Sequence, residues 1–223
     1  HMVTKKNEKI TGYSIYNKAV KDRTVESPLS ADKFYPDLPK TKFDVIYADP
    51  PWHYNGKLQF DKTSKDQEKI DPTKKIFIST PGFKYPTLKI EKLKQIPIQN
   101  IAKDNCILFM WTSNPHLAQA IELGKAWGFE YRTVAFVWNK GVHNPGKYTL
   151  SYCELCLLFK KGKIPTPRGA RNVKQIINVP RGKHSEKPKE VREGIEAMFP
   201  QQKRIELFAR EKVQKWKNWG LHL

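Results

Sequence analysis

The stretch that decides the fold is Phe43-Asp44-Val45-Ile46-Tyr47-Ala48-Asp49-Pro50-Pro51-Trp52. Its first six residues are nearly all apolar, which is typical of a strand buried inside a sheet. The two prolines that follow have no backbone N–H to donate, so the strand must end before them and the chain must enter a loop. The sequence therefore predicts a buried strand at residues 43–48 with a carboxylate, Asp49, at its carboxyl end.

Downstream of this strand, stretches with strand character alternate with stretches of helical spacing, and Gly, Pro and Asn mark the turns between them. We expect strands at 106–111, 131–138, 152–159, 176–179 and 204–209, and helices at 90–93, 115–127 and 188–199. Residues 139–150 would connect two of these strands into an antiparallel hairpin. This alternation predicts an α/β fold with a doubly wound sheet.

Asp49 stands where ligands bind in such sheets, outside the carboxyl ends of the strands. Its carboxylate can accept one hydrogen of an amino group and the Pro50 carbonyl can accept the other, which favours a nucleophilic amine. Trp52 can stack on a base, and the prolines keep the backbone rigid. The pattern favours chemistry on the amine of an aromatic ring system, although Asp-Pro-Pro alone also occurs as an ordinary strand-to-loop turn.

The composition points to a polyanionic partner. The 223-residue chain has 41 Lys and Arg against 22 Asp and Glu, a formal net charge of +19, which favours nucleic acid. An apolar content of 39% excludes a wholly disordered chain, and no apolar run is long enough to span a bilayer. Cys153-Glu154-Leu155-Cys156 has no second Cys/His pair nearby, which argues against a metal site.

The polar, lysine-rich residues 1–42 are predicted to form a basic arm before one domain at 43–223, and His1-Met2 is interpreted as a cloning scar. Residues 52–86 show little periodicity and exceed an ordinary connection in length, which indicates either a functional loop or disorder. The basic segment 160–174 is interpreted as a phosphate contact, with a solvated charged loop as the alternative.

Four sequence blocks follow one another along the chain: the tetrad Asp49-Pro50-Pro51-Trp52, the strand at 106–111, the stretch His184-Ser185-Glu186-Lys187-Pro188, and the stretch at 204–210. Together they resemble the MT-A group of adenine-N6 methyltransferases, which includes messenger-RNA enzymes and ciliate DNA enzymes. The tetrad matches the catalytic signature of that group. The resemblance covers residues 43–220 and implies a permuted Rossmann-like sheet, in which the cofactor strand follows the catalytic strand.

The resemblance also implies roles for individual residues. Asp49 and Pro50 would orient the target amine, with Pro51 completing the rigid turn and Trp52 stacked on the adenine. The donor would be S-adenosylmethionine, with Lys187 at its carboxylate end. The predicted donor-binding residues are Asp49, Lys187, Glu206, Phe208 and Arg210. The chain departs from the messenger-RNA enzymes after Arg210, where Glu211-Lys212-Val213 replaces a Pro-His-Asn stretch.

The predicted contacts with nucleic acid are Trp52, His53, Tyr54, His184 and Glu154, and for Glu154 a surface or salt-bridged role is an equal alternative. Relatives in this group pair an active fold with a degenerate one. The resemblance thus implies the active subunit of a nuclear heterodimer, with residues 139–150 at the contact and room for further DNA-binding subunits. A Lys-, Ile- and Asn-leaning composition favours the ciliate DNA enzymes. RNA methylation and a non-catalytic nucleic-acid-binding subunit are the alternatives.

Overall fold

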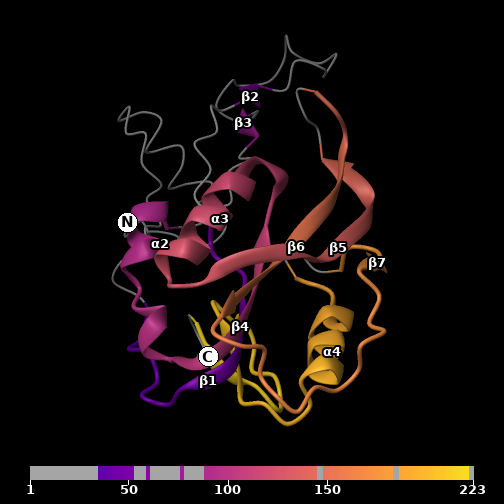
Figure 1. Cartoon of the computed structure of the whole chain (residues 1–223). Helices are drawn as coiled ribbons and strands as arrows, with labels where there is room; N and C mark the ends of the chain where they lie inside the picture. The colour runs from indigo at the N-terminus through magenta and orange to yellow at the C-terminus, as the bar shows by residue number, and fades with distance from the viewer. Residues whose placement is uncertain are drawn as a thin grey trace, which may run out of the picture. The chain divides into compact units, whose positions relative to one another are not determined.

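The computed structural model describes residues 35–52, 88–144, 148–182 and 186–220, together with two short strands at 59–60 and 76–77. The chain divides into two compact units, one formed by Phe34–Pro50 and Ile90–Leu223, the other by His1–Lys33 and Pro51–Lys89. The first unit contains a large sheet and the helices labelled in Figure 1. The boundary between the units falls inside the predicted catalytic tetrad, between Pro50 and Pro51.

The large unit is built on a seven-stranded mixed sheet with the strand order β7-β5-β6-β4-β1-β8-β9. The strands are β1 (Phe43–Ala48), β4 (Ala102–Thr112), β5 (Glu130–Asn144), β6 (Ser151–Lys161), β7 (Ile176–Asn178), β8 (Arg204–Leu207) and β9 (Lys217–Trp219). Strand β6 is antiparallel to both of its neighbours, β4 and β5, and the other pairings are parallel. Six strands therefore run in one direction, and the predicted β5–β6 hairpin is confirmed.

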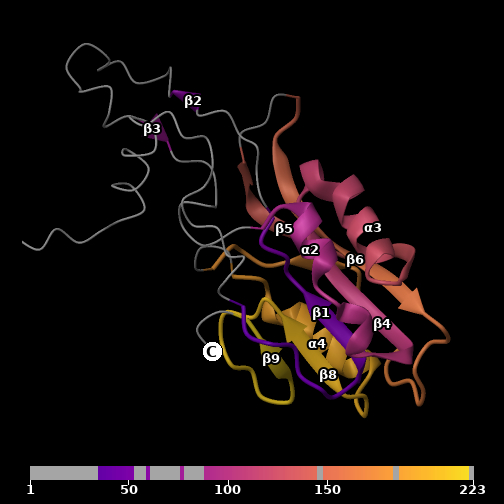
Figure 2. The ribbon, with the colours of Figure 1, turned by 90° about the vertical axis from the view of Figure 1, so that its left-hand side faces the viewer.

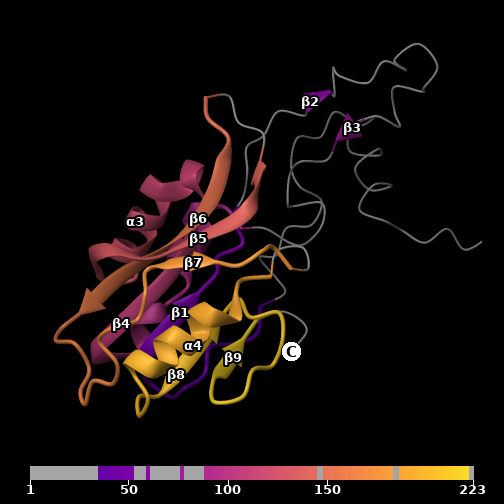
Figure 3. The ribbon, with the colours of Figure 1, turned by 90° about the vertical axis from the view of Figure 1, so that its right-hand side faces the viewer.

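Helices lie on both faces of this sheet, as Figures 2 and 3 show. Helix α4 (Lys189–Met198) covers one face, and α2 (Ile90–Gln95) and α3 (Leu117–Ala126) cover the other. The core beneath α4 collects alternate residues of the central strands, among them Val45, Tyr47, Ile107 and Phe109. Because β1 is packed on both sides, its nearly continuous apolar sequence is explained. The fold is the doubly wound α/β architecture that the sequence predicts.

Close packing of α3 on the sheet depends on Gly124. A Cβ atom at this position would collide with the Phe159 ring of β6. Gly128, at a φ of +86°, then ends the helical region in a left-handed conformation that glycine adopts without strain. Gly124 thus lets α3 pack closely against the Phe159 ring of β6.

The order of strands in space confirms the permutation. Strand β8 comes near the end of the chain, yet it lies beside β1 with Ala48 opposite Leu207. The predicted catalytic strand and the predicted cofactor strand are therefore parallel neighbours that end at the same level of the sheet.

Two features differ from the sequence predictions, and the interpretation of the basic segment at 160–174 as a phosphate contact stays a prediction. Strand β5 continues to Asn144, so the predicted connection at 139–150 begins as strand; Gly141, at a φ of +70°, lies in an irregular stretch of the pairing. Strand β9 was expected only as a basic tail. Because β6 runs against its neighbours, the basic segment that follows Lys161 begins at the edge of the sheet opposite Asp49.

The described end of the predicted arm, from Tyr35 onward, belongs to the large unit. Tyr35 stacks on Trp219, with ring centroids 4.9 Å apart, and the Trp219 indole N–H donates to the Pro36 carbonyl at 2.9 Å. The arm boundary at residue 42 stays a prediction, since residues 1–34 lie outside the described residues.

In the smaller unit, the described residues form two pieces of backbone pairing. Trp52 is buried and forms a parallel bridge with Leu88, whose N–H donates to the Pro51 carbonyl at 2.9 Å. Strands β2 (Gln59–Phe60) and β3 (Ile76–Phe77) pair antiparallel. Most of the long stretch at 52–86 lies outside the described residues, so the choice between a functional loop and disorder stays open.

Candidate active site

The candidate site lies at the end of the sheet that is formed by the carboxyl ends of the parallel strands. Asp49 is the first residue after β1, whose last residue, Ala48, is opposite Met110 of β4 and Leu207 of β8. The antiparallel direction of β6 brings the beginning of that strand to the same end of the sheet, and with it Glu154. Side chains from strands distant in the sequence therefore meet where α/β sheets bind ligands.

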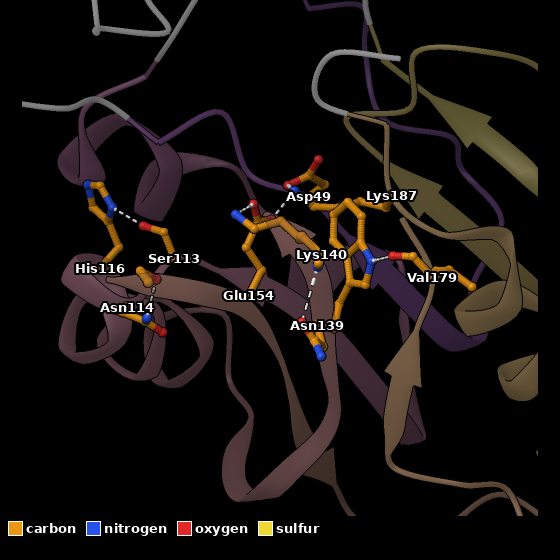
Figure 4. A network of polar contacts seen from close by, with 12 residues as sticks. Asp49, Ser113, Asn114, His116, Asn139, Lys140, Glu154, Val179 and Lys187 are labelled. Carbon is orange, nitrogen blue, oxygen red and sulfur yellow. Dashed lines mark hydrogen bonds and ion pairs between the residues drawn. The ribbon is translucent and has the colours of Figure 1, made fainter. Parts of the chain in front are cut away.

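A chain of ion pairs joins these side chains (Figure 4). The Lys187 ammonium lies 3.4 Å from Oδ1 of Asp49 and donates to Oε2 of Glu154 at 2.8 Å. The Lys140 ammonium donates to the other oxygen, Oε1, at 3.1 Å. On the far side, Arg210 Nη2 lies 3.7 Å from Oδ2 of Asp49. Lys187 also stands over the face of the buried Trp111 ring, 5.4 Å from its centroid.

These ion pairs shift the pKa values of Lys187 and Glu154. Burial opposes the charge on Lys187, but the Asp49 and Glu154 carboxylates outweigh that penalty and raise its pKa. For Glu154, burial acts to raise the pKa, and the charges and hydrogen bonds of Lys187 and Lys140 overcome it and lower the pKa. Both groups are therefore fully charged at neutral pH.

Glu206 of β8 stands in a different network beneath α4. Its Oε2 accepts from Arg192 at 3.3 Å, and the same guanidinium also donates to Glu211 at 3.1 Å. Burial raises the pKa of Glu206 to about 7; Arg192 acts to lower it, while the charges of Asp49 and Glu211 add to the rise. Glu206 is thus a carboxyl group that changes charge near neutral pH.

Phe208 follows β8 with a φ of 60°, a left-handed conformation that costs about 1–3 kcal/mol for a residue other than glycine. Its ring is buried and packs against the rings of Tyr35, Trp127 and Trp219. This backbone kink occurs between Glu206 and Arg210, at the point where the chain leaves the sheet. Strain at such a point is common in ligand-binding sites.

The structure brings together five of the predicted site residues: Asp49, Glu154 and Lys187 in one network, Arg210 on the other side of Asp49, and Glu206 on the adjacent strand. Glu154 is salt-bridged to Lys140 and Lys187, and its contact with nucleic acid stays a prediction. Phe208 lies in the aromatic cluster beside them. Pro50 is buried in the large unit, whereas Pro51 and Trp52 belong to the smaller unit. His53, Tyr54 and His184 lie outside the described residues.

The sequence does not single out Lys140 or Tyr35 beside the site, nor Arg192 and Asn218. Lys140 was assigned to a connection because Gly141 follows it, yet it lies within β5 and its side chain is only 2% exposed. Tyr35 was assigned to the arm. Burial raises the pKa of its hydroxyl, on which Arg210 and Asp49 act in opposite directions, so this hydroxyl lies within the electrostatic field of the site.

The described residues fit an S-adenosylmethionine molecule. Lys187 offers a cation for a carboxylate, and Glu206 offers a carboxyl group for ribose hydroxyls. Opposite Glu206 on β9 is Asn218, whose buried amide nitrogen has no hydrogen-bond partner among the residues that the structure describes. In the same residues, no three His, Cys, Asp or Glu side chains are grouped as metal ligands, and no helix is long and apolar enough to cross a bilayer.

The fold and this site together define a class of protein. The MT-A70 family model matches residues 43–222, and the chain belongs to that family of methyltransferases. Its members use S-adenosylmethionine as the methyl donor.

The chain is also similar to individual curated proteins. It is 57% identical to the Type II methyltransferase M.MunI of Mycoplasma sp. over 215 residues, which cover 96% of this chain and 91% of M.MunI. It is 26% and 28% identical to the N(6)-adenine-specific methyltransferases METTL4 of Mus musculus and Homo sapiens over 197 residues each. The match covers 80% of this chain and only 37% of either METTL4 protein.

Proposed function

We propose that this protein transfers a methyl group from S-adenosylmethionine to the 6-amino group of adenine in DNA. The observation that carries the proposal is the Asp49 carboxylate, which lies at the end of the central strand, between Lys187 and Arg210 and beside the cofactor strand β8. The similarity to a type II methyltransferase favours DNA as the substrate, and the similarity to adenine-specific enzymes favours the 6-amino group.

The donor supplies an electrophilic methyl group on a sulfonium. In the transfer, the bond from sulfur to carbon breaks, sulfur keeps the electron pair, and the adenine nitrogen forms the new bond to carbon. Asp49 accepts a hydrogen bond from the amine and holds its lone pair toward the methyl group, and the nitrogen loses one proton to solvent. Such a displacement is accelerated mainly by alignment and by fixed charges.

Access to the amine requires an unstacked base, because the 6-amino group of a paired adenine cannot reach a site at the edge of a sheet. Stacking of Trp52 on the base stays a prediction from the sequence, because its side chain is only 6% exposed in the structure. The formal net charge of +19 supports binding to the phosphate backbone. Binding of DNA is therefore expected to weaken steeply as salt is added.

A substrate panel tests the proposal. The protein is incubated with methyl-labelled S-adenosylmethionine and, in parallel, duplex DNA, single-stranded DNA and RNA of the same adenine-containing sequence, and the nucleosides are analysed by mass spectrometry. We expect labelled N6-methyldeoxyadenosine from DNA. Label on RNA alone would establish the RNA alternative, and no label on any nucleic acid, even after a partner subunit is added, would contradict the proposal.

The degenerate partner subunit and the nuclear location implied by the resemblance stay predictions. The substrate panel also bears on the partner, since activity of the isolated chain on DNA would show that no second subunit is needed. Activity only after a partner is added would support the heteromeric proposal.

A further inference from the structure

Lys140 is a buried lysine that the proposed mechanism leaves without a role. Its side chain is 2% exposed, and lysine is almost never buried to that degree unless it is paired. The pairing partner is Glu154, whose Oε1 accepts from the Lys140 ammonium at 3.1 Å. The two residues come from adjacent strands, β5 and β6, so the pair is built into the sheet itself.

Glu154 uses its two oxygens for two different lysines. Oε1 accepts from Lys140, and Oε2 accepts from Lys187 at 2.8 Å. Lys187 comes from the segment before α4, far from the hairpin in sequence, and its ammonium is 3.4 Å from Asp49. Positive and negative side chains therefore alternate from the sheet interior to the proposed catalytic carboxylate, in the order Lys140, Glu154, Lys187 and Asp49.

The order of charges matters because Lys187 is shared between two carboxylates. With Lys140 present, part of the negative charge of Glu154 is balanced, so Lys187 remains between Glu154 and Asp49. Without Lys140, one of two changes would follow at the Glu154 carboxyl group. It stays ionised and draws Lys187 toward β6, or burial favours its protonated form and Lys187 loses an ionic partner. Either outcome moves the Lys187 ammonium from the position it holds in the structure.

We propose that Lys140 is a positioning residue that acts through Glu154 to fix the Lys187 ammonium, and so the carboxylate end of the methyl donor. This inference rests on the proposed function, because the donor contact of Lys187 belongs to it. Lys140 touches neither donor nor substrate in this account. Its effect is on donor affinity and passes through Glu154.

Calorimetric binding of S-adenosylmethionine tests this proposal without any nucleic acid. K140M, E154Q and the double variant are compared with the unmodified protein. We expect each single substitution to weaken donor binding about tenfold, and the double variant to bind no more weakly than the weaker single variant, because residues in one network are coupled. In a methylation assay of K140M, the KM for the donor should rise while kcat at saturating donor changes little.

Two further variants separate positioning from general structure. K103M removes a more exposed lysine, with 42% of its side chain exposed, which pairs with Asp44 at the opposite end of β1 at 2.8 Å, and should leave donor affinity unchanged. K140R keeps the positive charge and should bind the donor more tightly than K140M. Thermal unfolding of every variant identifies a loss of folding, and if K140M does not fold, E154Q and K140R decide the question.

The proposal is overturned if K140M binds the donor as tightly as the unmodified protein, if the effects of K140M and E154Q multiply in the double variant, or if K103M weakens binding equally. Failure of the proposed function gives a different result. The unmodified protein would then bind the donor, the variants would behave as expected, and adenine in DNA would remain unmethylated.

Discussion

Two glutamates near the candidate site, Glu154 and Glu206, have pKa shifts of opposite sign. Both are largely buried, with 23% and 15% of their side chains exposed. Glu154 is bound by two lysines, which lower its pKa. Glu206 shares one arginine with Glu211 and faces Asp49, and its pKa rises to about 7. Burial acts in the same direction on both, so the number of cations for each carboxylate determines which shift results.

The comparison separates two tasks within one site. Glu154 and Lys187 keep their charges over a wide pH range, which suits the proposed task of holding the donor in position. The network of Glu206, Arg192 and Glu211 has more carboxylates than cations among the described residues. Its central carboxyl group changes charge near neutral pH. The permanently charged Glu154 of β6 and the titrating Glu206 of β8 are thus separated by strands β4 and β1.

The largest expected effect follows from replacing Lys187, the cation that Asp49 and Glu154 share. K187M is expected to weaken binding of S-adenosylmethionine about 100-fold, because a charge-assisted contact to the donor is lost and two carboxylates are left without their common partner. Calorimetry measures the affinity. K189M is the matched control, since Lys189 is 75% exposed and makes only a surface pair with Glu193. Equal affinity of K187M and K189M would contradict the assignment.

The next prediction compares the glutamates directly by chemical unfolding at several pH values. Glu206 has a folded-state pKa above its ordinary 4.5, so its contribution to stability falls as pH rises from about 4.5 to 7. E206Q should therefore be more stable than the unmodified protein at pH 8, by about 2 kcal/mol. Glu154 has a lowered pKa, so its contribution is present at neutral pH and lost in acid.

E154Q should accordingly be less stable than the unmodified protein at pH 7, by about 2 kcal/mol, with a difference that narrows as the pH falls below 4.5. The two variants replace the same residue type by the same amide, so each is the control for the other. Changes of the same sign at neutral pH would refute the account of the two networks.

A smaller effect is expected at Arg192. In R192M the only described ion-pair partner of Glu206 is lost, and the pKa of Glu206 should increase further, by about one pH unit. Carbon-13 NMR of the labelled glutamate carboxyl groups follows the titration. A pKa that stays near 7 in R192M would show that Arg192 does not hold Glu206.

The smallest effect is expected at Glu211, which stands where the messenger-RNA enzymes have a different stretch. Its side chain is 61% exposed, so solvent screens its repulsion of Glu206. In E211Q, the same NMR titration should show the pKa of Glu206 lowered by less than about half a pH unit. An increase would mean that Glu211 acts mainly through its contact with Arg192.

A structural feature could be predicted from the sequence where residues close together in the chain determine it, and could not where the folded chain brings distant residues together. The strand at 43–48 and the carboxylate after it could be predicted, because an apolar run followed by two prolines has few other solutions. Lys140 could not, because Gly141 ends the strand pattern in the sequence while the pairing with β6 continues it in the fold. The raised pKa of Glu206 likewise arises from burial, to which the charges of Asp49 and Glu211 add, and burial is a property of the folded chain.

The central claim, that Asp49 holds the amine during methyl transfer, is tested most directly by D49N. The unmodified protein and D49N are saturated with labelled S-adenosylmethionine and duplex DNA, and labelled N6-methyldeoxyadenosine is counted in a single turnover. We predict that D49N binds the donor but transfers the methyl group at least about 100-fold more slowly. Transfer by D49N at the rate of the unmodified protein would contradict the account.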